Sequence, residues 1–161
     1  MTALLIKPPH RISDDGTMNV HTVFLAGTID NGASRDWQQE AYNILNKLEK
    51  PVHVYNPRRD DWDPSLEPSA SNKVFREQVE WELDYLEEVD TIFMHFEPGS
   101  KSPITLLELG MWLERDPYKL IVSCPDGFWR KGNVDITCKR AGVLVFDDLD
   151  MAYLQLVSAL K

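Results

Sequence analysis

The chain has 161 residues, of which 43% are hydrophobic and 27% charged, and its formal net charge at pH 7 is −9. This length suits one domain with its own core, and the acidic surface disfavours a nucleic acid polymer as a partner. The sequence has no apolar run that could span a membrane and no secretory signal pattern, so we expect a cytoplasmic protein without membrane contact. Its two cysteines, Cys124 and Cys138, are expected to be free thiols.

The predicted elements alternate along the chain. Residues 1–20 carry paired prolines and an Asp-Asp-Gly turn and are expected to form an N-terminal arm, which leaves residues 21–161 as the domain. Short β-branched and aromatic runs predict strands at residues 21–27, 52–55, 91–96, 119–123 and 143–146. Helical spacing and capping residues predict helices at residues 37–48, 72–88, 103–116 and 149–160. Residues 124–140 are expected to be irregular, and Asn31 or Ser34 is expected to cap the first helix.

This alternation predicts the fold class. Strands that alternate with helices form parallel sheets whose two faces are covered by helices. We therefore predict a single-domain, doubly wound α/β fold of the Rossmann or flavodoxin-like kind, with a five-stranded parallel sheet. Ligands of such sheets bind beyond the carboxyl ends of the strands, so functional residues are expected in the loops that follow them.

Glu108 stands out by its neighbours. Between Ile104 and Leu113 the only polar side chains are those of Thr105 and Glu108. A carboxyl group in apolar surroundings loses hydration, which raises its pKa, and the start of a helix favours a negative charge. A structural role is the alternative, because Thr105 and Glu108 have capping-box spacing and glutamate suits any exposed helix face.

Two further positions have both a functional and a structural interpretation. Asp84 lies on the helix before the third strand among other acidic residues, and spacing alone favours a solvated face. Gly27 follows the first strand, where a glycine permits either close approach of a ligand or a tight turn. The sequence contains no dinucleotide, zinc-ligand, Walker or serine-nucleophile pattern, so neither a metal nor an organic cofactor is expected.

Three blocks, Val23–Ile29, Asp84–Ile92 and Ser102–Gly110, together resemble the nucleoside 2-deoxyribosyltransferase superfamily, including its deoxynucleoside monophosphate N-glycosidase branch. The first is similar to that family's first strand and ligand loop. The second is similar to the helix end and third strand that bear an aspartate, and the third contains the nucleophile motif Glu-Leu-Gly. The resemblance spans most of residues 20–150, and Asp126–Asp135 resembles a less studied branch.

The resemblance implies an enzyme that acts on 2'-deoxynucleosides. Glu108 would attack the anomeric carbon and form a covalent deoxyribosyl ester, and Asp84 would donate a proton to the departing nucleobase. Transfer of the sugar to another nucleobase is the leading hypothesis. A hydrolase that uses water as the acceptor is one alternative, and a non-enzymatic nucleotide-binding module is another.

The resemblance also implies where the substrate binds and that the chain forms a homo-oligomer. The implied substrate-binding residues are Gly27, Thr28, Asp30, Ser102 and Asn133. Among them, Ser102 would lie near the 5' end of the sugar, and Asn133 would reach into a neighbouring subunit's site. We expect at least a dimer, with Asn133 or Trp129 at the interface, and a nucleoside and a nucleobase as the small-molecule partners.

Two residues depart from the family pattern. Phe24 stands where family members often carry a tyrosine that hydrogen-bonds the nucleophile, so another group must orient Glu108, with Tyr55 as the candidate. Asp30 stands where the monophosphate glycosidases carry a basic residue. A negative Asp30 opposes a 5'-phosphate, which favours free nucleosides as substrates unless a basic side chain from residues 58–59 folds in.

Overall fold

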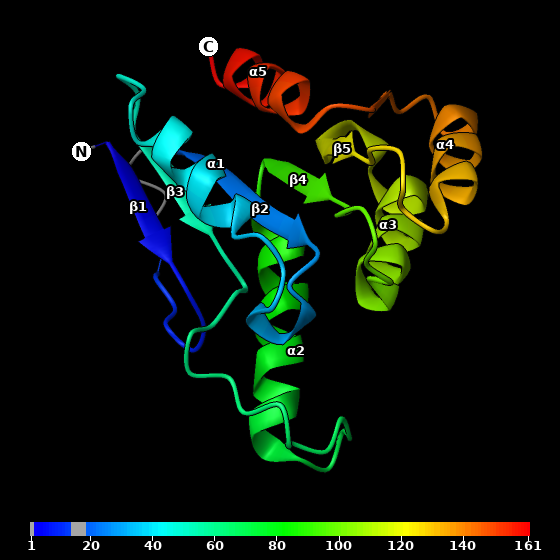
Figure 1. The fold of residues 1–161 in the computed structure, drawn as a ribbon. Coiled ribbons are helices and arrows are strands. Elements are labelled where there is room, and N and C mark those ends of the chain that lie inside the picture. The colour runs from blue at the N-terminus through cyan, green and yellow to red at the C-terminus, as the bar shows by residue number, and fades with distance from the viewer. Residues whose placement is uncertain (1, 14–18) are drawn as a thin grey trace.

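Figure 1 shows the computed structural model of the chain, which describes residues 2–13 and 19–161. Within these residues a sheet of six parallel strands has the order β1-β3-β2-β4-β5-β6. The strands are β1 (Ala3–Ile6), β2 (His21–Gly27), β3 (Val52–Tyr55), β4 (Thr91–His95), β5 (Leu120–Ser123) and β6 (Val145–Phe146). The α-helices are α1 (Trp37–Leu45), α2 (Lys73–Glu88), α3 (Pro103–Arg115), α4 (Lys131–Arg140) and α5 (Leu149–Ala159). Two 3-10 turns, η1 (Asp30–Gly32) and η2 (Pro117–Lys119), complete the described elements.

The predicted parallel α/β architecture is confirmed, but the predicted number of five strands is one too low. The additional strand, β1, lies within residues 1–20, where we expected an arm, and pairs with β3 at the edge of the sheet. Its apolar run is only four residues long and is followed by Pro8 and Pro9, so the sequence pattern resembled that of an arm. Hydrogen bonds from Thr2 to Asn46 and Leu48 fix the start of this strand beside the end of α1.

A second difference is α4, which lies in the stretch predicted to be irregular. Gly132, Asn133 and several β-branched residues give this segment a low intrinsic helix propensity. Val134 and Cys138, which are one turn apart, are both buried in the core, so tertiary packing stabilises the helix. Cys138 and Cys124 are free thiols, as expected.

The first helix begins at a different cap from the one predicted. Asp36 is the cap of α1, and its carboxylate accepts a hydrogen bond from the backbone N–H of Gln39. The hydroxyl of Ser34 instead donates to the carbonyl of Ile29 within the preceding turn. The side chain of Asn31, the other predicted cap, lies outside the described residues.

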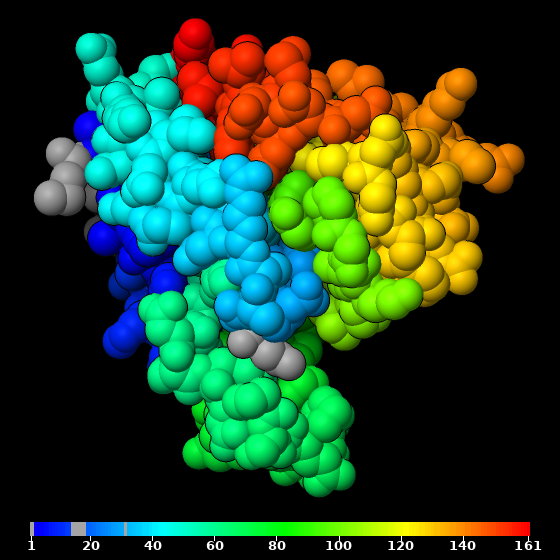
Figure 2. Space-filling model, in the orientation of Figure 1, coloured from blue at the N-terminus to red at the C-terminus, as the bar shows by residue number. Residues whose placement is uncertain are grey.

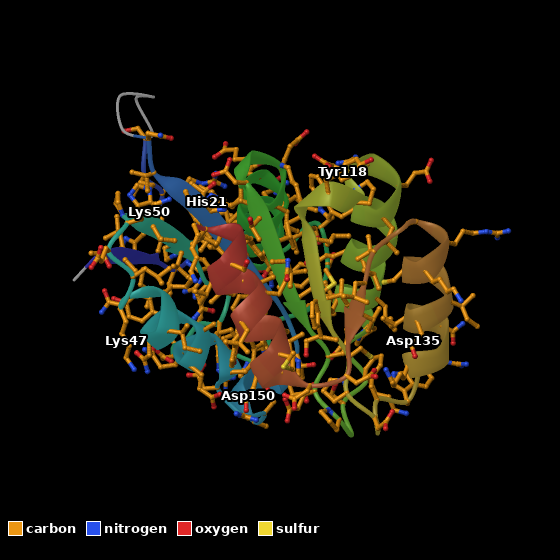
Figure 3. The ribbon with its side chains drawn as sticks, turned by 90° about the horizontal axis from the view of Figure 1, so that it is seen from above. His21, Lys47, Lys50, Tyr118, Asp135 and Asp150 are labelled. Carbon is orange, nitrogen blue, oxygen red and sulfur yellow. The ribbon has the colours of Figure 1, made fainter. Side chains whose placement is uncertain are left out.

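Two hydrophobic layers hold helices on the two faces of the sheet. Along β2, Val23 and Leu25 point to a core shared with α1 and α5, whereas Phe24 and Ala26 point to a core shared with α2, α3 and α4. In Figure 3, α5 lies on one side of the sheet, with Asp150 in its first turn. No helix in the described part of the chain is long and apolar enough to cross a membrane.

The strand order creates a crevice beside β2. From β2 the chain first adds β3 on one side and then β4, β5 and β6 on the other, so the strand order reverses between β2 and β4. Gly27 at the end of β2 lies opposite His95 at the end of β4. The loops that follow these two strands lead to helices on opposite faces of the sheet, which is the arrangement that opens a ligand crevice in doubly wound folds.

Candidate active site

Two glutamates on α2 and α3, the half-buried Glu82 and the buried Glu108, form an interacting pair of carboxyl groups. Glu108 in the second turn of α3 is only 7% exposed, and its pKa is raised to about 8 by burial and, secondarily, by the charge of Glu82. Glu82 on α2 has a pKa raised to about 7 by burial. Because the charge of Glu82 disfavours ionisation of Glu108, the pair binds about one proton between pH 7 and 8, and the higher pKa of Glu108 places that proton mainly on Glu108. A pair of this kind supplies an acid and a base in one site.

Glu82 lies next to the buried residues along one side of α2. The residues of α2 that are buried are Gln78, Trp81, Tyr85 and Leu86, and Glu82 follows Gln78 by one turn. The amide nitrogen of Gln78 donates a hydrogen bond of 2.7 Å to a carboxyl oxygen of Glu82. That bond favours the ionised form and partly opposes the effect of burial on the pKa of Glu82.

The structure does not bring Asp84 together with Glu108. Two residues along an α-helix are turned by about 200°, so Asp84 points away from the side on which Glu82 lies. Its carboxylate is half-exposed and forms an ion pair of 2.9 Å with Arg11 in the N-terminal segment. Glu82 is thus a candidate site residue that the sequence analysis did not identify. The pattern that could have indicated it is the pair of polar residues Gln78 and Glu82, which lie one turn apart beside the buried apolar residues of α2.

Three hydroxyl groups lie together at the carboxyl edge of the sheet. Thr28 Oγ1 lies 2.6 Å from Ser102 Oγ and 3.1 Å from Ser100 Oγ, and the two serine oxygens are 2.9 Å apart. The backbone N–H of Glu97 also donates to Thr28 Oγ1. All three hydroxyl-bearing residues are buried, so the structure joins the loop after β2 with the loop before α3. We refer to Thr28, Ser100 and Ser102 as the hydroxyl cluster.

Ser102 has an unusual conformation for a helix cap. It occupies the predicted cap position of α3, followed by Pro103, but its side chain makes no capping hydrogen bond. Its φ of 44° and ψ of 53° place it in the left-handed region, which is unfavourable for a residue other than glycine. The hydroxyl of Ser102 instead joins the hydroxyl cluster, so the strained backbone directs this side chain toward the loop after β2.

For Gly27 the structure supports the structural interpretation, in which a glycine is needed because the backbone is tightly packed. Its φ is +148°, and a Cβ atom there would lie 2.2 Å from the carbonyl oxygen of His95. Only glycine therefore fits between β2 and β4 at this point. The next residue, Thr28, donates its N–H to the same carbonyl, which fixes the start of the loop that carries the hydroxyl cluster.

The remaining predicted binding residues lie on the surface. Asp30 is exposed in η1 with a left-handed φ of 47°, and Asn133 is exposed on α4. Trp129 is 47% exposed, and its ring lies 4.3 Å from the cationic groups of both Lys101 and Arg130. These positions are accessible to a ligand or to a second subunit, and the structure brings none of them into the Glu82–Glu108 pair.

The two arginines of the loop after β3 already form hydrogen bonds with other groups of the protein. The guanidinium of Arg58 is buried and donates to the carbonyls of Gly32, Ser34 and Arg35. Arg59 pairs in two hydrogen bonds with Asp61. Arg58 therefore folds in and ties the loop after β3 to the segment between β2 and α1, whereas Arg59 pairs within its own loop.

Aromatic rings from β2, β3 and α2 pack together to form a wall. Phe24 is buried, with its ring centroid 6.0 Å from that of Trp81, and offers no hydroxyl group. Tyr55, at the end of β3, stacks on Tyr85 at 4.1 Å. The carbonyl of His10 accepts a hydrogen bond from the indole N–H of Trp81, so the N-terminal segment covers part of this wall. The proposed orientation of Glu108 by Tyr55 stays a prediction.

A second polar network lies at the ends of β4 and β5. The buried ring of His95 bonds Ser123 Oγ at 2.9 Å and Glu97 at 2.7 Å. Burial lowers the pKa of His95, which favours the neutral ring. His95 and Glu97 border a hollow of about 300 Å³ between the starts of α1 and α5. Figure 2 shows the bordering segments, coloured from blue through green and yellow to orange, meeting on one face.

A metal site within a protein needs several donor side chains close together. No group of three or more His, Cys, Asp or Glu side chains in that part of the chain is placed to hold a metal ion. Carboxyl groups such as those of Glu82 and Glu108 can transfer a proton and can act as nucleophiles.

The fold and the carboxyl pair define a doubly wound α/β protein with a candidate site for acid–base and covalent catalysis. Residues 20–128 match the model of a family described as nucleoside 2-deoxyribosyltransferase like. Because this match covers more than half of the chain, the chain belongs to that family, and the family resemblance carried by the three sequence blocks is confirmed. The family binds small nucleoside substrates. No curated protein matches the chain.

Proposed function

We propose that this chain is a nucleoside 2-deoxyribosyltransferase, which cleaves the N-glycosidic bond of a 2'-deoxynucleoside and transfers the sugar to another nucleobase. The observation that carries this proposal is the interacting carboxyl pair of Glu82 and Glu108, found in a chain of the deoxyribosyltransferase-like family. Cleavage of this bond needs a nucleophile at the anomeric carbon and a proton for the departing base. A carboxyl pair that shares one proton supplies both.

In the free protein the shared proton lies mainly on Glu108, whose pKa is the higher of the two, so the reactive form is the one in which this proton has moved to Glu82. In the first step from that form, the carboxylate of Glu108 attacks the anomeric carbon and forms an ester bond. The bond from that carbon to the base nitrogen breaks, its electron pair stays with the base, and the proton of Glu82 neutralises the base. In the second step, an incoming base returns a proton to Glu82 and displaces Glu108 from the sugar. Two displacements at one carbon retain its configuration.

The assignment of the acid role to Glu82 replaces the role implied for Asp84. Burial raises the pKa of Glu82 to about 7, so that both its protonated and its ionised forms are accessible near neutral pH, as a group that donates and later accepts a proton requires, whereas the half-exposed carboxylate of Asp84 is held by Arg11.

The hydroxyl cluster supports a free nucleoside as the substrate. A ring of three hydroxyl groups can direct each of its hydrogens to a neighbour, which leaves lone pairs on Ser100 and Ser102 to accept from a sugar hydroxyl. A phosphate needs donors and positive charge instead. The guanidinium of Arg58 donates to carbonyls of the segment between β2 and α1, that of Arg59 pairs with Asp61, and Asp30 is acidic, so these residues do not favour a 5'-monophosphate.

A two-tube assay tests the proposal. The enzyme is incubated with a 2'-deoxynucleoside, alone or with a second free nucleobase, and the products are separated by chromatography. We expect the new deoxynucleoside in the second tube and its loss in Glu108→Gln, while Glu114→Gln, an exposed glutamate on the same helix, retains activity. Free deoxyribose as the main product in both tubes would instead identify a hydrolase. Binding of the nucleoside without turnover would identify a non-enzymatic binding module.

A further inference from the structure

The side chain of Gln78 has an arrangement that packing alone does not explain. It is 8% exposed on α2, one turn before Glu82, and its amide nitrogen donates both to Glu82 Oε1 at 2.7 Å and to the carbonyl of Pro57 at 3.3 Å. Among the described residues, no donor reaches its buried amide oxygen. A buried acceptor without a partner is unfavourable, so the arrangement is retained at a cost to stability.

The carbonyl of Pro57 determines which end of the amide faces Glu82. If the amide were turned over, its oxygen would face both the Pro57 carbonyl and a carboxyl oxygen, and one N–H bond to each would be lost. The observed orientation therefore presents an N–H donor to Glu82 Oε1. An oxygen that accepts this bond is the less favourable place for the carboxyl proton, which leaves Oε2 to carry it.

We propose that Gln78 is a positioning residue, which holds the carboxyl group of Glu82 so that its proton sits on Oε2 and is delivered to the departing base. This inference rests on the proposed function. Burial and the bond from Gln78 set the pKa of Glu82, and the charge of Glu82 in turn acts on Glu108 of α3. Arg11, on the N-terminal segment beside α2, is paired with Asp84. Among the described residues Gln78 is thus the neutral group that sets the orientation of this acid.

The variant Gln78→Met tests the proposal because methionine has a similar length and lacks the amide. We expect kcat for an ordinary 2'-deoxynucleoside to fall at least about 10-fold with little change in KM, since the loss falls on proton transfer. The alkaline limb of the pH profile should move to higher pH, because the lost bond stabilised the ionised form of Glu82. Gln39→Met, which changes a half-buried glutamine of α1 that bonds Asn43, is the matched control and should behave as wild type.

A second substrate distinguishes the loss of the positioning role of Gln78 from general damage to the active site. The base of 7-methyl-2'-deoxyguanosine already carries a positive charge and leaves as a neutral molecule without receiving a proton. We expect Gln78→Met to cleave this nucleoside at close to the wild-type rate. An equal loss for both substrates, or an unchanged rate and pH profile for the ordinary one, would overturn the role of Gln78.

Failure of the proposed function would be visible separately. If the wild-type protein cleaves neither nucleoside, the proposed function is wrong, and Gln78 is then tested by NMR titration of 13C-labelled glutamate carboxyl groups. We expect a higher pKa for Glu82 in Gln78→Met than in wild type. An unchanged titration of Glu82 would refute the hydrogen bond on which the inference depends.

Discussion

At the scale of single residues, only one member of the carboxyl pair could be predicted from the sequence. Glu108 could be found because it is one of two polar side chains in an apolar helix segment. Its partner could not, because Phe75, Val79, Leu83 and Leu86 give the preceding helix an apolar side in the sequence that does not include Glu82. Leu83 is in fact 41% exposed, and the buried stripe runs through the aromatic Trp81 and Tyr85 together with Gln78 and Leu86. That rotation of the helix is what turns Glu82 toward Glu108.

A comparison of two neutral variants tests the choice of acid. We expect Glu82→Gln to lower kcat on the order of 100- to 10,000-fold, the usual contribution of a positioned acid. Asp84→Asn removes only a half-exposed ion pair with Arg11 and should change kcat less than about 3-fold. Steady-state kinetics of both variants decides the point. A large loss in Asp84→Asn with a small loss in Glu82→Gln would restore the role first implied for Asp84.

The raised pKa of Glu108 makes the stability of the protein depend on pH. A carboxyl whose pKa rises from 4.5 to about 8 on folding binds its proton more tightly when folded. Its contribution is therefore fully present below pH 4.5 and is lost as the pH rises through 8. We expect Glu108→Gln to be more stable than wild type at pH 9, by on the order of 2 to 4 kcal/mol more than any difference at pH 5.

Denaturant unfolding of the two proteins at both pH values measures this effect. Glu114→Gln, which changes an exposed residue of the same helix, should show no such pH-dependent difference. If Glu108→Gln differs from wild type equally at pH 5 and pH 9, the carboxyl group of Glu108 is not buried as described.

At the scale of elements, the hydroxyl cluster depends on a contact that no pattern within one segment could reveal. Thr28 belongs to the loop after β2, and Ser102 lies 74 positions later at the start of α3. The sequence correctly placed Ser102 at the helix start, but local propensity predicted a capping bond, whereas the side chain bonds Thr28. The helix α4 was missed for the opposite reason, because local propensity is low and packing forms the helix.

The variant Thr28→Val tests the role of the hydroxyl cluster. Valine has nearly the same shape but leaves the N–H of Glu97 and the serine hydroxyls without their shared partner. We expect a loss of about 1 to 3 kcal/mol in the free energy of unfolding and a raised KM for the nucleoside, with a smaller effect on kcat. Thr22→Val, near the amino end of β2, is the control for binding. An unchanged KM in Thr28→Val would contradict a substrate contact at the cluster.

At the scale of the whole molecule, the alternation of strands and helices was enough to predict the parallel sheet and its two covered faces. The order β3-β2-β4-β5-β6 and the crevice beside β2 follow from the short connections of such folds. The edge strand β1 was missed because four apolar residues before two prolines give too short a pattern. The composition of the candidate site, by contrast, depends on contacts between segments. The sequence alone therefore singled out Glu108 but not Glu82, which interacts with it from another helix.

The predicted association of the chain is a further property of the whole molecule. We expect at least a dimer, with the exposed Trp129 or Asn133 at the interface. Light scattering at the concentration used for the activity assay measures the mass. A monomer that is fully active would contradict this expectation.

The central claim is that Glu108 becomes covalently bonded to the sugar, and mass spectrometry of a trapped intermediate tests it most directly. A 2'-fluorinated deoxynucleoside slows both displacements, because the electron-withdrawing fluorine destabilises the positively charged transition state. We expect digestion of the treated enzyme to yield one peptide heavier by the fluorinated sugar, with the modification on Glu108 and absent from Glu108→Gln. A fully active enzyme that carries the sugar on another residue, or on none, would contradict the account.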